Sequence, residues 1–363
     1  MKNICFFNST VNWGGGEKLY LEYALKFKSK RYKVVFFTSP GSPLHKKSDE
    51  ANIQSDGFPI RSLTYLNPYR IFKLYTFFIT HKIDVVFFSA TQDMKAGGIA
   101  AKFAGVKKII FFRDQAEPIR RFFINRLIYK SITTHIIASS EETARQMLKN
   151  YTLVIPEQKV KVIYHGIDLQ EFDKQKYNKI IHKAADEIII GTAGTFSKMK
   201  DQTYLIDIAV KLKAEGINFK LFIAGSGELE GELKKLSERF NLQDHIIFMG
   251  FINNLKSFMT DLDLFILPSI SEGFGYVLIE AMAASKPVVA FNTRTNPEII
   301  KDGKTGFLVN FPDTALFKEK VKLLITDQGL RQEMGKRARA HVEQSFNINQ
   351  KITEIENLVL KTR

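Results

Sequence analysis

Two series of short apolar runs constrain the fold of this chain more than any other feature. In the first half, runs rich in Phe and β-branched residues alternate with amphipathic segments such as 17–29 and 93–104. These runs are "ICFFN" 4–8, "KVVFFT" 33–38, "DVVFFS" 84–89, "KKIIFF" 107–112 and "THIIAS" 134–139. Such runs are typical of buried parallel strands, and their alternation with helices indicates βαβ units. The first half is therefore predicted to form a doubly wound parallel sheet.

The second half repeats this pattern. Its runs are "EIIIGTAG" 187–194, "FKLFIAG" 219–225, "HIIFMG" 245–250, "LFILP" 264–268 and "PVVAF" 287–291. Residues 164–187 interrupt the series with a turn and a charged stretch, as an interdomain connection does. We predict an α/β protein of two domains, 1–170 and 171–345, for which 363 residues suffice. The amphipathic segment 346–363 has no following strand, and we expect it to return to the first domain.

Charge divides unevenly between the two halves. Residues 1–170 carry 26 Lys or Arg against 13 Asp or Glu, whereas the remainder carries 27 against 25. The first half is thus suited to an anionic surface, unless the excess serves solubility alone. The single cysteine, Cys5, cannot form an internal disulfide, and no apolar run approaches the ~18 residues of a membrane span. We expect a cytoplasmic protein that is neither secreted nor transmembrane.

The stretch "SEGFGYVLIEAMAASKP" (271–287) places a glycine-rich turn between a buried strand and an apolar helix. Gly273 and Gly275 let the backbone approach an anion at the helix N-terminus, where amide donors are unsatisfied. Glu280 lies within the helix, and a buried carboxylate requires a hydrogen-bonding partner. A ribose diol supplies two hydroxyl donors, which predicts a nucleotide site. The alternatives are that Glu280 meets solvent or a structural lysine, and that Glu272 only complements the helix dipole.

This two-glutamate pattern closely resembles the motif of family-4-type retaining glycosyltransferases with the GT-B architecture. Supporting pieces occur in the family's order: "GGGE" 14–17, "IIASSEET" 136–143, "VIYHGIDLQEF" 162–172, "KDQTYLI" 200–206, "LFIAGSGELEGEL" 221–233, "IIFMGFI" 246–252 and "EIIKDGKTGFLV" 298–309. The resemblance implies two Rossmann-like domains facing a central cleft. It also implies that the second domain holds the donor nucleotide, the first holds the acceptor, and the C-terminal helix crosses back to the first domain.

Site residues follow from the resemblance position by position. Glu280 would bind the donor ribose, and Glu272 would contact hydroxyls of the donor sugar near the reacting carbon. The resemblance further implies backbone contacts to the diphosphate and sugar from Gly273, Phe274 and Gly275, and a cradle for the base from Gly250, Phe251 and Ile252. Gly15 and Gly16 in the first βα turn would add amides for the phosphates, although tight turns also use glycine for backbone geometry alone.

Two departures from the family's pattern concern charged residues. Lys200 is the expected cation for the leaving diphosphate, but Thr195 stands where the family usually places an arginine. Lys198 can replace that arginine only as a point charge, without its bidentate fork. Arg113 and Asp114 occupy a strand end where relatives have a histidine. There they either face the ligand, Arg113 towards an anion and Asp114 as proton acceptor or sugar ligand, or form a local salt bridge or cap.

Other cofactor chemistries find no support in the sequence. The "DLD" at 261–263 opens a buried strand, and the seven histidines show no spacing suited to metal ligands. Neither a phosphate-binding P-loop nor a dinucleotide fingerprint is present. We therefore expect no bound metal or cofactor, with a UDP- or GDP-sugar as donor substrate.

Two segments of the basic half combine aromatic and cationic residues at helical spacing. They are "YRIFKLYTFFITHK" (69–82) and "IRRFFINRLIYK" (119–130). Such helices are typical of membrane interfaces, and they predict peripheral contact with anionic lipid at the inner face of the membrane. The alternative is that their aromatic residues are core and their charges face water. No module for nucleic-acid recognition is present.

Together with these observations, the resemblance to family-4-type enzymes implies a retaining, metal-independent hexosyltransferase. It would transfer sugar to a glycan or lipid-linked saccharide in cell-surface polysaccharide or lipopolysaccharide biosynthesis. The alternatives are a nucleotide-sugar epimerase of the same architecture and a non-catalytic, membrane-associated subunit that binds sugar nucleotides.

Overall fold

The computed structural model describes residues 2–119, 122–149, 155–198 and 200–360. The chain divides into two compact units, residues 1–164 with 349–363 and residues 165–348. Two residues of the basic segment 119–130 and the last three of the expected C-terminal helix lie outside the described residues. Among the described residues, no helix is both long and apolar enough to cross a membrane.

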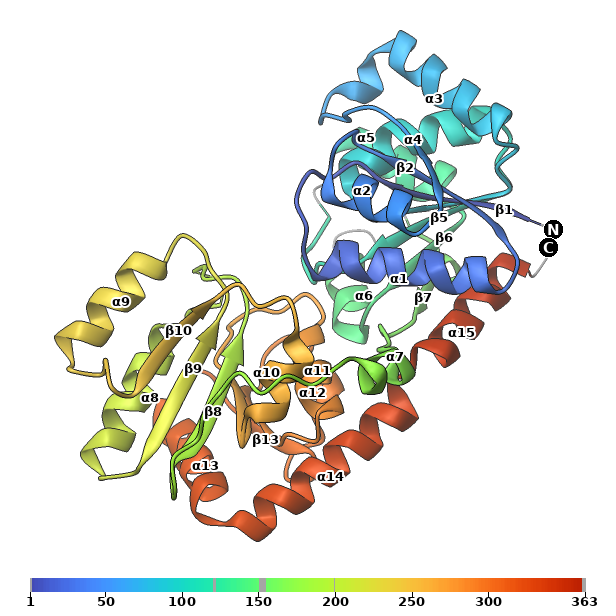
Figure 1. Cartoon of the computed structure of the whole chain (residues 1–363). Coiled ribbons are helices and arrows are strands. Elements are labelled where there is room, and N and C mark those ends of the chain that lie inside the picture. The colour runs from blue at the N-terminus through green and yellow to red at the C-terminus, as the bar shows by residue number, and fades with distance from the viewer. Residues whose placement is uncertain (1, 120–121, 150–154, 199, 361–363) are drawn as a thin grey trace. The chain divides into compact units, whose positions relative to one another are not determined.

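A seven-stranded parallel sheet forms the centre of the first unit (Figure 1). Its strands are β1 (Asn3–Asn8), β2 (Lys33–Thr38), β3 (Gln54–Asp56), β4 (Val85–Phe88), β5 (Lys108–Arg113), β6 (His135–Ala138) and β7 (Val160–Val162). They pair in the order β3-β2-β1-β4-β5-β6-β7, with β1 parallel to both β2 and β4. This is the doubly wound order, in which the direction of winding reverses between β1 and β4.

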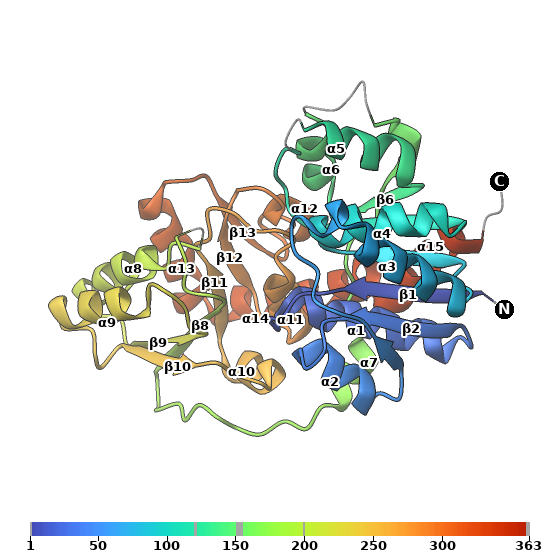
Figure 2. The ribbon, with the colours of Figure 1, turned by 90° about the horizontal axis from the view of Figure 1, so that it is seen from above.

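Helices cover both faces of this sheet, as Figures 1 and 2 show. They are α1 (Gly15–Ser29), α2 (Pro43–Glu50), η1 (Thr64–Leu66), α3 (Pro68–Thr80), α4 (Thr91–Phe103), α5 (Phe123–Leu127), η2 (Ile128–Ile132), α6 (Glu141–Leu148), η3 (Glu157–Lys159) and α15 (Ile348–Leu360). On one face α3, α4 and η2 bury a core around Phe7 and Phe88. On the other, Phe27 of α1 packs on Phe6 and Phe87. Both faces of the strands are therefore apolar, which explains their continuous hydrophobic runs.

The second unit has the same plan with six parallel strands. They are β8 (Ile188–Ala193), β9 (Phe219–Ala224), β10 (Ile246–Gly250), β11 (Leu264–Leu267), β12 (Val288–Phe291) and β13 (Gly306–Val309). The sheet order is β10-β9-β8-β11-β12-β13, so the winding reverses between β8 and β11. Its helices are α7 (Leu169–Lys174), α8 (Thr203–Ala214), α9 (Glu230–Arg239), α10 (Leu255–Asp261), α11 (Tyr276–Ala283), α12 (Asn296–Ile299), α13 (Thr314–Thr326) and α14 (Gln328–Ser345). The predicted α/β fold with two doubly wound parallel sheets is confirmed.

The boundary between the units lies six residues before the expected position at 170. Residues 165–168 belong to the second unit because they are tied to it locally. The Tyr276 hydroxyl donates to the Gly166 carbonyl at 3.3 Å, and Ile167 forms a parallel bridge with Asn347. A Cβ at Gly166 would lie 2.6 Å from the Cα of Ile348, so glycine permits this close packing.

The C-terminal helix α15 belongs to the first unit. Its apolar side chains at Ile352, Ile355 and Val359 are buried. Glu356 forms an ion pair with Lys30, the C-cap residue of α1, and accepts a hydrogen bond from the Tyr32 hydroxyl at 2.8 Å. The amphipathic helix expected at 346–363 thus covers an apolar surface of the first unit.

Candidate active site

The carboxyl ends of β8 and β11 mark the point where the second sheet changes winding direction. Ligands of open α/β sheets bind beyond the strand ends at this point, because the two following loops diverge there. The loop after β8 carries Lys198 and Lys200, and the turn after β11 carries Glu272. Residues that lie 72 positions apart in the sequence are thereby brought to one edge of the sheet.

The turn between β11 and α11 has the geometry of an anion-binding loop. Gly275 is the N-cap of α11 and adopts φ +77°, a left-handed conformation that disfavours side chains. No side-chain hydrogen bond caps the helix, and a helix N-terminus with this geometry favours an anion. The Phe274 ring is buried against His165, at 4.8 Å between ring centroids. The Phe274 side chain is thus packed inside the protein and does not face a ligand.

Glu272 and Lys200 form an ion pair across the point of reversal. The Lys200 Nζ contacts Glu272 Oε2, whereas Glu272 Oε1 is buried without a hydrogen-bond partner. Glu272 is only 6% exposed, so its second oxygen is an acceptor hidden from bulk water. An unpartnered buried carboxylate oxygen is costly, and it indicates a missing hydroxyl or amide donor.

The β8–α8 loop is held in place by its own hydrogen bonds. Gln202 donates through Nε2 to the Thr195 carbonyl at 2.8 Å, and its Oε1 is buried without a partner. The side chains of Thr195 and Lys198 are exposed. Lys198 therefore offers only a point charge near the site. Thr195 has no guanidinium group and cannot make the two parallel hydrogen bonds that an arginine would make to a phosphate.

Backbone hydrogen bonds and close backbone packing connect three loops at this edge. Phe196 donates to the Ser226 carbonyl at 3.0 Å, and Gly225 donates to the Gly250 carbonyl at 2.7 Å. Gly227 approaches Phe196 so closely that a Cβ would lie 2.3 Å from its carbonyl oxygen. These backbone contacts fix the loops after β8, β9 and β10 relative to one another.

The end of β10 presents an aromatic side chain to solvent. Gly250 has φ +64°, and the chain turns there so that Phe251 is 68% exposed. Ile252 follows with intermediate exposure. An exposed aromatic ring at the carboxyl edge of the sheet is suited to stacking on a planar ligand such as a base.

Glu280 lies in α11, one turn beyond the helix start. The carboxylate is buried, and the neighbouring residues Leu278, Ile279 and Met282 are fully buried. The expected burial of a carboxylate in an apolar helix is therefore observed, and Glu280 does have an interaction within the protein.

Two buried polar residues near this turn were missed by the sequence analysis. Thr295 Oγ1 and Asn296 Oδ1 have no hydrogen-bond partner, although both residues are fully buried. Asn296 Oδ1 would lie 3.6 Å from a Cβ on Gly275, and Thr293 Oγ1 donates to the Ser269 carbonyl at 3.2 Å. The β12–α12 turn therefore adjoins the β11–α11 turn. The signal available in the sequence was a polar "TRTN" directly after a buried strand.

At the carboxyl edge of the first sheet, Gly15 and Gly16 begin α1 and are exposed. Neither has a positive φ, and a Cβ on either would meet nothing within 4 Å. The packing of the protein does not require glycine at these positions. A ligand that approaches the backbone there would explain both residues.

A buried acid, also missed by the sequence analysis, stands at the point of reversal in the first sheet. Asp93 of α4 accepts hydrogen bonds from the backbone amide of Ser9 at 2.8 Å and from the Ser9 hydroxyl. Burial raises the pKa of Asp93 to about 7, and the Ser9 hydrogen bonds oppose this shift. Burial likewise raises the pKa of Tyr20 well above its usual value, with further contributions from Cys5, Asp93 and Asp114.

Arg113 and Asp114 end β5 at this same edge. Arg113 is buried, and its Nη2 donates to the Glu117 carbonyl at 2.9 Å. Its Nε is buried without a partner, and Nη1 reaches Gln115 at 3.4 Å. Two nitrogens of the guanidinium therefore contact the following loop, through neither a salt bridge nor a helix cap, and the ligand role expected for Arg113 stays a prediction. Asp114 is half-buried and interacts within the protein.

The predicted site residues thus fall into two groups. One group stands at the carboxyl edge of the second sheet: Lys198, Lys200, Gly250, Phe251, Ile252, Glu272, Gly273, Phe274, Gly275 and Glu280. The other stands at the carboxyl edge of the first: Gly15, Gly16, Arg113 and Asp114. In the described part of the chain, no three His, Cys, Asp or Glu side chains are placed to hold a metal ion. The first group offers amides, a cation, an acceptor oxygen and an aromatic ring to one anionic ligand.

Comparison with known proteins identifies two matching family models. The model "Glycosyltransferase Family 4" matches residues 13–171, and "Glycosyl transferases group 1" matches residues 173–341. Each model therefore corresponds to one half of the chain.

Individual proteins show the same similarity over most of the chain. The glycosyltransferase EpsF of Bacillus subtilis is 25% identical over 312 residues, which cover 81% of this chain and 80% of EpsF. An Escherichia coli enzyme, UDP-Gal:alpha-D-GlcNAc-diphosphoundecaprenol alpha-1,3-galactosyltransferase, is 24% identical over 80% of this chain and 78% of its own. The crystal structure of Anabaena HepE with UDP and glucose superposes with a TM-score of 0.83, at 19% identity and 99% coverage of both chains.

Proposed function

The chain belongs to the glycosyltransferases of family 4 and group 1, and from this premise we propose a retaining, metal-independent sugar transfer. The donor is a nucleoside-diphosphate sugar, UDP- or GDP-linked. The acceptor is a glycan or a lipid-linked saccharide in cell-surface polysaccharide or lipopolysaccharide biosynthesis. The protein is a hexosyltransferase-type enzyme, so the proposal concerns its donor, acceptor and stereochemistry.

The pair of Glu272 and Lys200 is the observation that carries the proposal. One Glu272 oxygen is neutralised by Lys200, and the other is a buried acceptor without a donor. A sugar hydroxyl at Glu272 Oε1 would complete the hydrogen bonding of this carboxylate. The diphosphate would then lie against the first amides of α11 and the Lys200 ammonium.

The chemical step requires stabilisation of the departing diphosphate. Negative charge grows on its oxygen as the bond to the sugar breaks, and Lys200 with the α11 N-terminus supplies fixed positive charge there. Lys200 and the α11 N-terminus would thus neutralise the leaving diphosphate, as a metal ion does in other transferases. In a same-face transfer the leaving phosphate oxygen takes the acceptor proton, so that no separate base is required. Glu280 binds the ribose hydroxyls, and Phe251 stacks on the base.

Two observations support the proposed acceptor and its location: the name of a relative and the basic charge of the first half of this chain. The name of the E. coli relative describes an acceptor linked to diphosphoundecaprenol, and HepE was crystallised with UDP and glucose. An acceptor of this kind is anionic and anchored in a membrane. The excess of 26 Lys or Arg over 13 Asp or Glu in residues 1–170 suits such an acceptor and a peripheral position on the cytoplasmic face.

A thermal-shift panel of UDP-, GDP-, ADP- and CMP-sugars tests the donor. A ligand at 100 times its Kd stabilises the folded protein by about 2.7 kcal/mol, so the true donor should raise Tm clearly. Glu280→Ala should remove most of that shift. If no sugar nucleotide changes Tm, the proposed donor site is contradicted.

Product analysis tests the reaction. Release of nucleoside diphosphate should depend on an added acceptor, should persist in a chelator, and should give a product with the donor's anomeric configuration by NMR. Release without any acceptor would favour the epimerase instead. Tight donor binding without turnover on a panel of lipid-linked saccharides would favour the non-catalytic subunit.

A further inference from the structure

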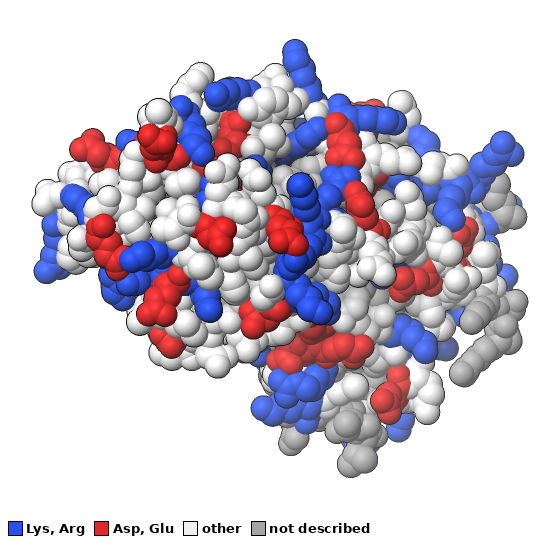
Figure 3. All heavy atoms as spheres, turned by 90° about the horizontal axis from the view of Figure 1, so that it is seen from below, with Lys and Arg blue, Asp and Glu red and all other residues white. Residues whose placement is uncertain are grey.

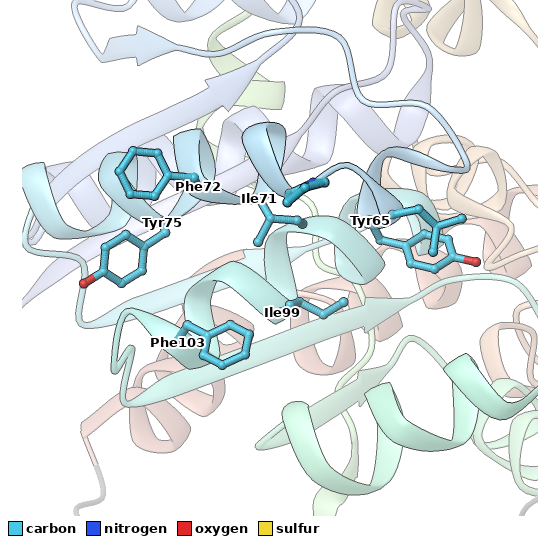
Figure 4. A pocket seen from close by; sticks show the side chains of 8 residues that line it. Tyr65, Ile71, Phe72, Tyr75, Ile99 and Phe103 are labelled. Atoms are coloured by element: carbon cyan, nitrogen blue, oxygen red, sulfur yellow. The ribbon is translucent and has the colours of Figure 1, made fainter.

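An open groove runs between α3 and α4 on the outer surface of the first unit (Figure 4). It holds about 640 Å³ and is lined by Tyr65, Leu66, Pro68, Ile71, Phe72, Tyr75, Ile99 and Phe103. Phe72 and Tyr75 come from α3, and Ile99 and Phe103 come from α4. No charged residue lines this groove.

The groove rim exposes large apolar side chains to water. Phe103 is 75% exposed, Leu66 65% and Phe72 61%. Leu63 and Tyr69 beside them are exposed to a similar degree. Single exposed apolar residues are ordinary, but a contiguous group around an apolar groove marks a binding surface.

Basic side chains surround this apolar surface. Arg70, Lys73 and Lys95 lie over the rings of Phe58, Tyr69 and Tyr65, at 5.7, 4.8 and 5.8 Å from the ring centroids. These cation–π contacts hold the cations at the rim of the groove.

The local sequence is nearly free of acids. Residues 57–83 contain no Asp or Glu, and in α4 the sole acid, Asp93, is fully buried. The view in Figure 3, from the side opposite to Figure 2, shows acidic side chains dispersed among basic ones instead. The α3–α4 face therefore combines exposed apolar side chains with basic residues and has no exposed acidic residue in these segments.

We infer that the α3–α4 face, comprising η1, α3 and α4, docks on the surface of an anionic phospholipid bilayer. Phe72 and Phe103 enter the boundary between headgroups and acyl chains, and Lys73 and Lys95 contact lipid phosphates. This inference rests on the proposed function, because docking on the membrane would give the enzyme access to a lipid-linked acceptor.

Charge favours the bilayer over a second copy of the chain. In a two-fold dimer the same patch faces itself, so the basic rim of one copy would oppose the basic rim of the other. An anionic membrane reverses that sign and also accepts the aromatic side chains.

Co-sedimentation of the full-length protein with vesicles tests the inference. The vesicles contain phosphatidylcholine alone or with phosphatidylglycerol, at low and high salt. We expect binding to the anionic vesicles at low salt, and at least about tenfold weaker binding after Phe72→Ser with Phe103→Ser, given the apolar area removed. Lys73→Glu with Lys95→Glu should weaken vesicle binding by about tenfold or more, since each basic residue near the surface contributes to the binding free energy.

The matched control is Phe240→Ser, which changes an exposed Phe of the second unit. This variant should bind the vesicles as the wild type does.

Three measurements decide between the possible outcomes. Equal binding to neutral vesicles, or full binding by the Phe72/Phe103 variant, overturns the inference. Gel filtration that shows a dimer abolished by the same two changes assigns the face to a second copy and also overturns it. The sugar-nucleotide thermal shift is run on every variant: donor stabilisation without vesicle binding removes the docking inference alone, and vesicle binding without donor stabilisation removes the proposed function alone.

Discussion

Glu272 has two oxygens in unlike surroundings. One is paired with Lys200, and the other is buried without a donor. A buried carboxylate oxygen without a hydrogen-bond donor costs free energy of folding, and a ligand hydroxyl bound there, as we propose, would recover that cost. The residue is thus best explained as part of a binding site rather than as a support for the fold.

Lys200→Met should lower kcat by about 100-fold or more, because it removes the cation that stabilises the leaving diphosphate. It also leaves the Glu272 carboxylate buried without its cation, which should cost up to about 3 kcal/mol of unfolding free energy. The double variant Lys200→Met with Glu272→Gln should recover part of that stability but none of the activity. Steady-state kinetics and urea unfolding measure the two effects.

Lys235→Met, which changes an exposed lysine of α9, is the control for the same chemical change. It should alter neither kcat nor stability. If the double variant is as unstable as Lys200→Met alone, the ion pair is not coupled in the way proposed.

Asp93 predicts a specific pH dependence of stability. Its pKa is about 7 in the folded protein and 3.8 in an exposed aspartate, so the folded state binds more protons between these pH values. Its contribution to stability is therefore complete below about pH 4 and is lost as pH rises towards 7, by at most about 1.4 kcal/mol per pH unit. Asp93→Asn removes this titration.

Urea unfolding at several pH values measures the effect as the difference between wild type and Asp93→Asn. The wild type should lose stability relative to the variant as pH rises from 4 to 7. Asp244→Asn, at an exposed aspartate, should leave the pH profile unchanged. Parallel profiles for wild type and Asp93→Asn would show that Asp93 does not titrate in this range.

At the scale of elements, the two helix starts use glycine for different reasons. Gly275 caps α11 with φ +77°, so its backbone requires glycine. Gly15 and Gly16 begin α1 with ordinary φ and open space around them. A conformational reason therefore holds for glycine at the start of α11, whereas neither φ nor packing explains glycine at the start of α1.

Gly16→Ala should leave the unliganded protein as stable or more stable by about 0.5 kcal/mol, because alanine favours the helix and restricts the unfolded chain. Its donor affinity should fall, since the added methyl blocks the approach of phosphate to the amides. Gly231→Ala in the first turn of α9, where a Cβ also meets nothing, should give the same stability effect with normal donor affinity. Unfolding and donor titration calorimetry measure both quantities.

At the scale of the whole chain, the last helix completes the first unit. Ile355 of α15 is fully buried there, although most of that unit ends at residue 164. Folding of the first unit thus depends on a segment that follows the entire second unit in the sequence.

Ile355→Ala should destabilise the first unit by about 2 to 4 kcal/mol through loss of buried volume. Leu360→Ala, on the same helix but 47% exposed, should cost less than about 1 kcal/mol. Hydrogen exchange can assign the loss to residues 1–164. Equal protection in wild type and Ile355→Ala would show that α15 contributes nothing to that unit.

The repeating strands, the two-domain organisation and the edge at which the site stands were all predictable, because hydrophobic periodicity and glycine placement are local signals. The short strands β3, β7 and β13 were missed, since all three are edge strands of three or four residues and depend on one neighbour for pairing. The first unit ends at residue 164 where 170 was expected, and the close packing of Gly166 on Ile348 just after it is a contact that local sequence does not reveal.

Residue types and spacing alone sufficed for the fold class, and they singled out Glu272 and Glu280, which are both buried; their role in donor binding stays a prediction. Spatial contacts between distant residues required folding of the whole sheet: Lys200 with Glu272, Ser9 with Asp93, and the α3–α4 groove. The physical reason is that a parallel sheet brings loops together by strand order, and strand order arises from long-range pairing that local sequence does not encode.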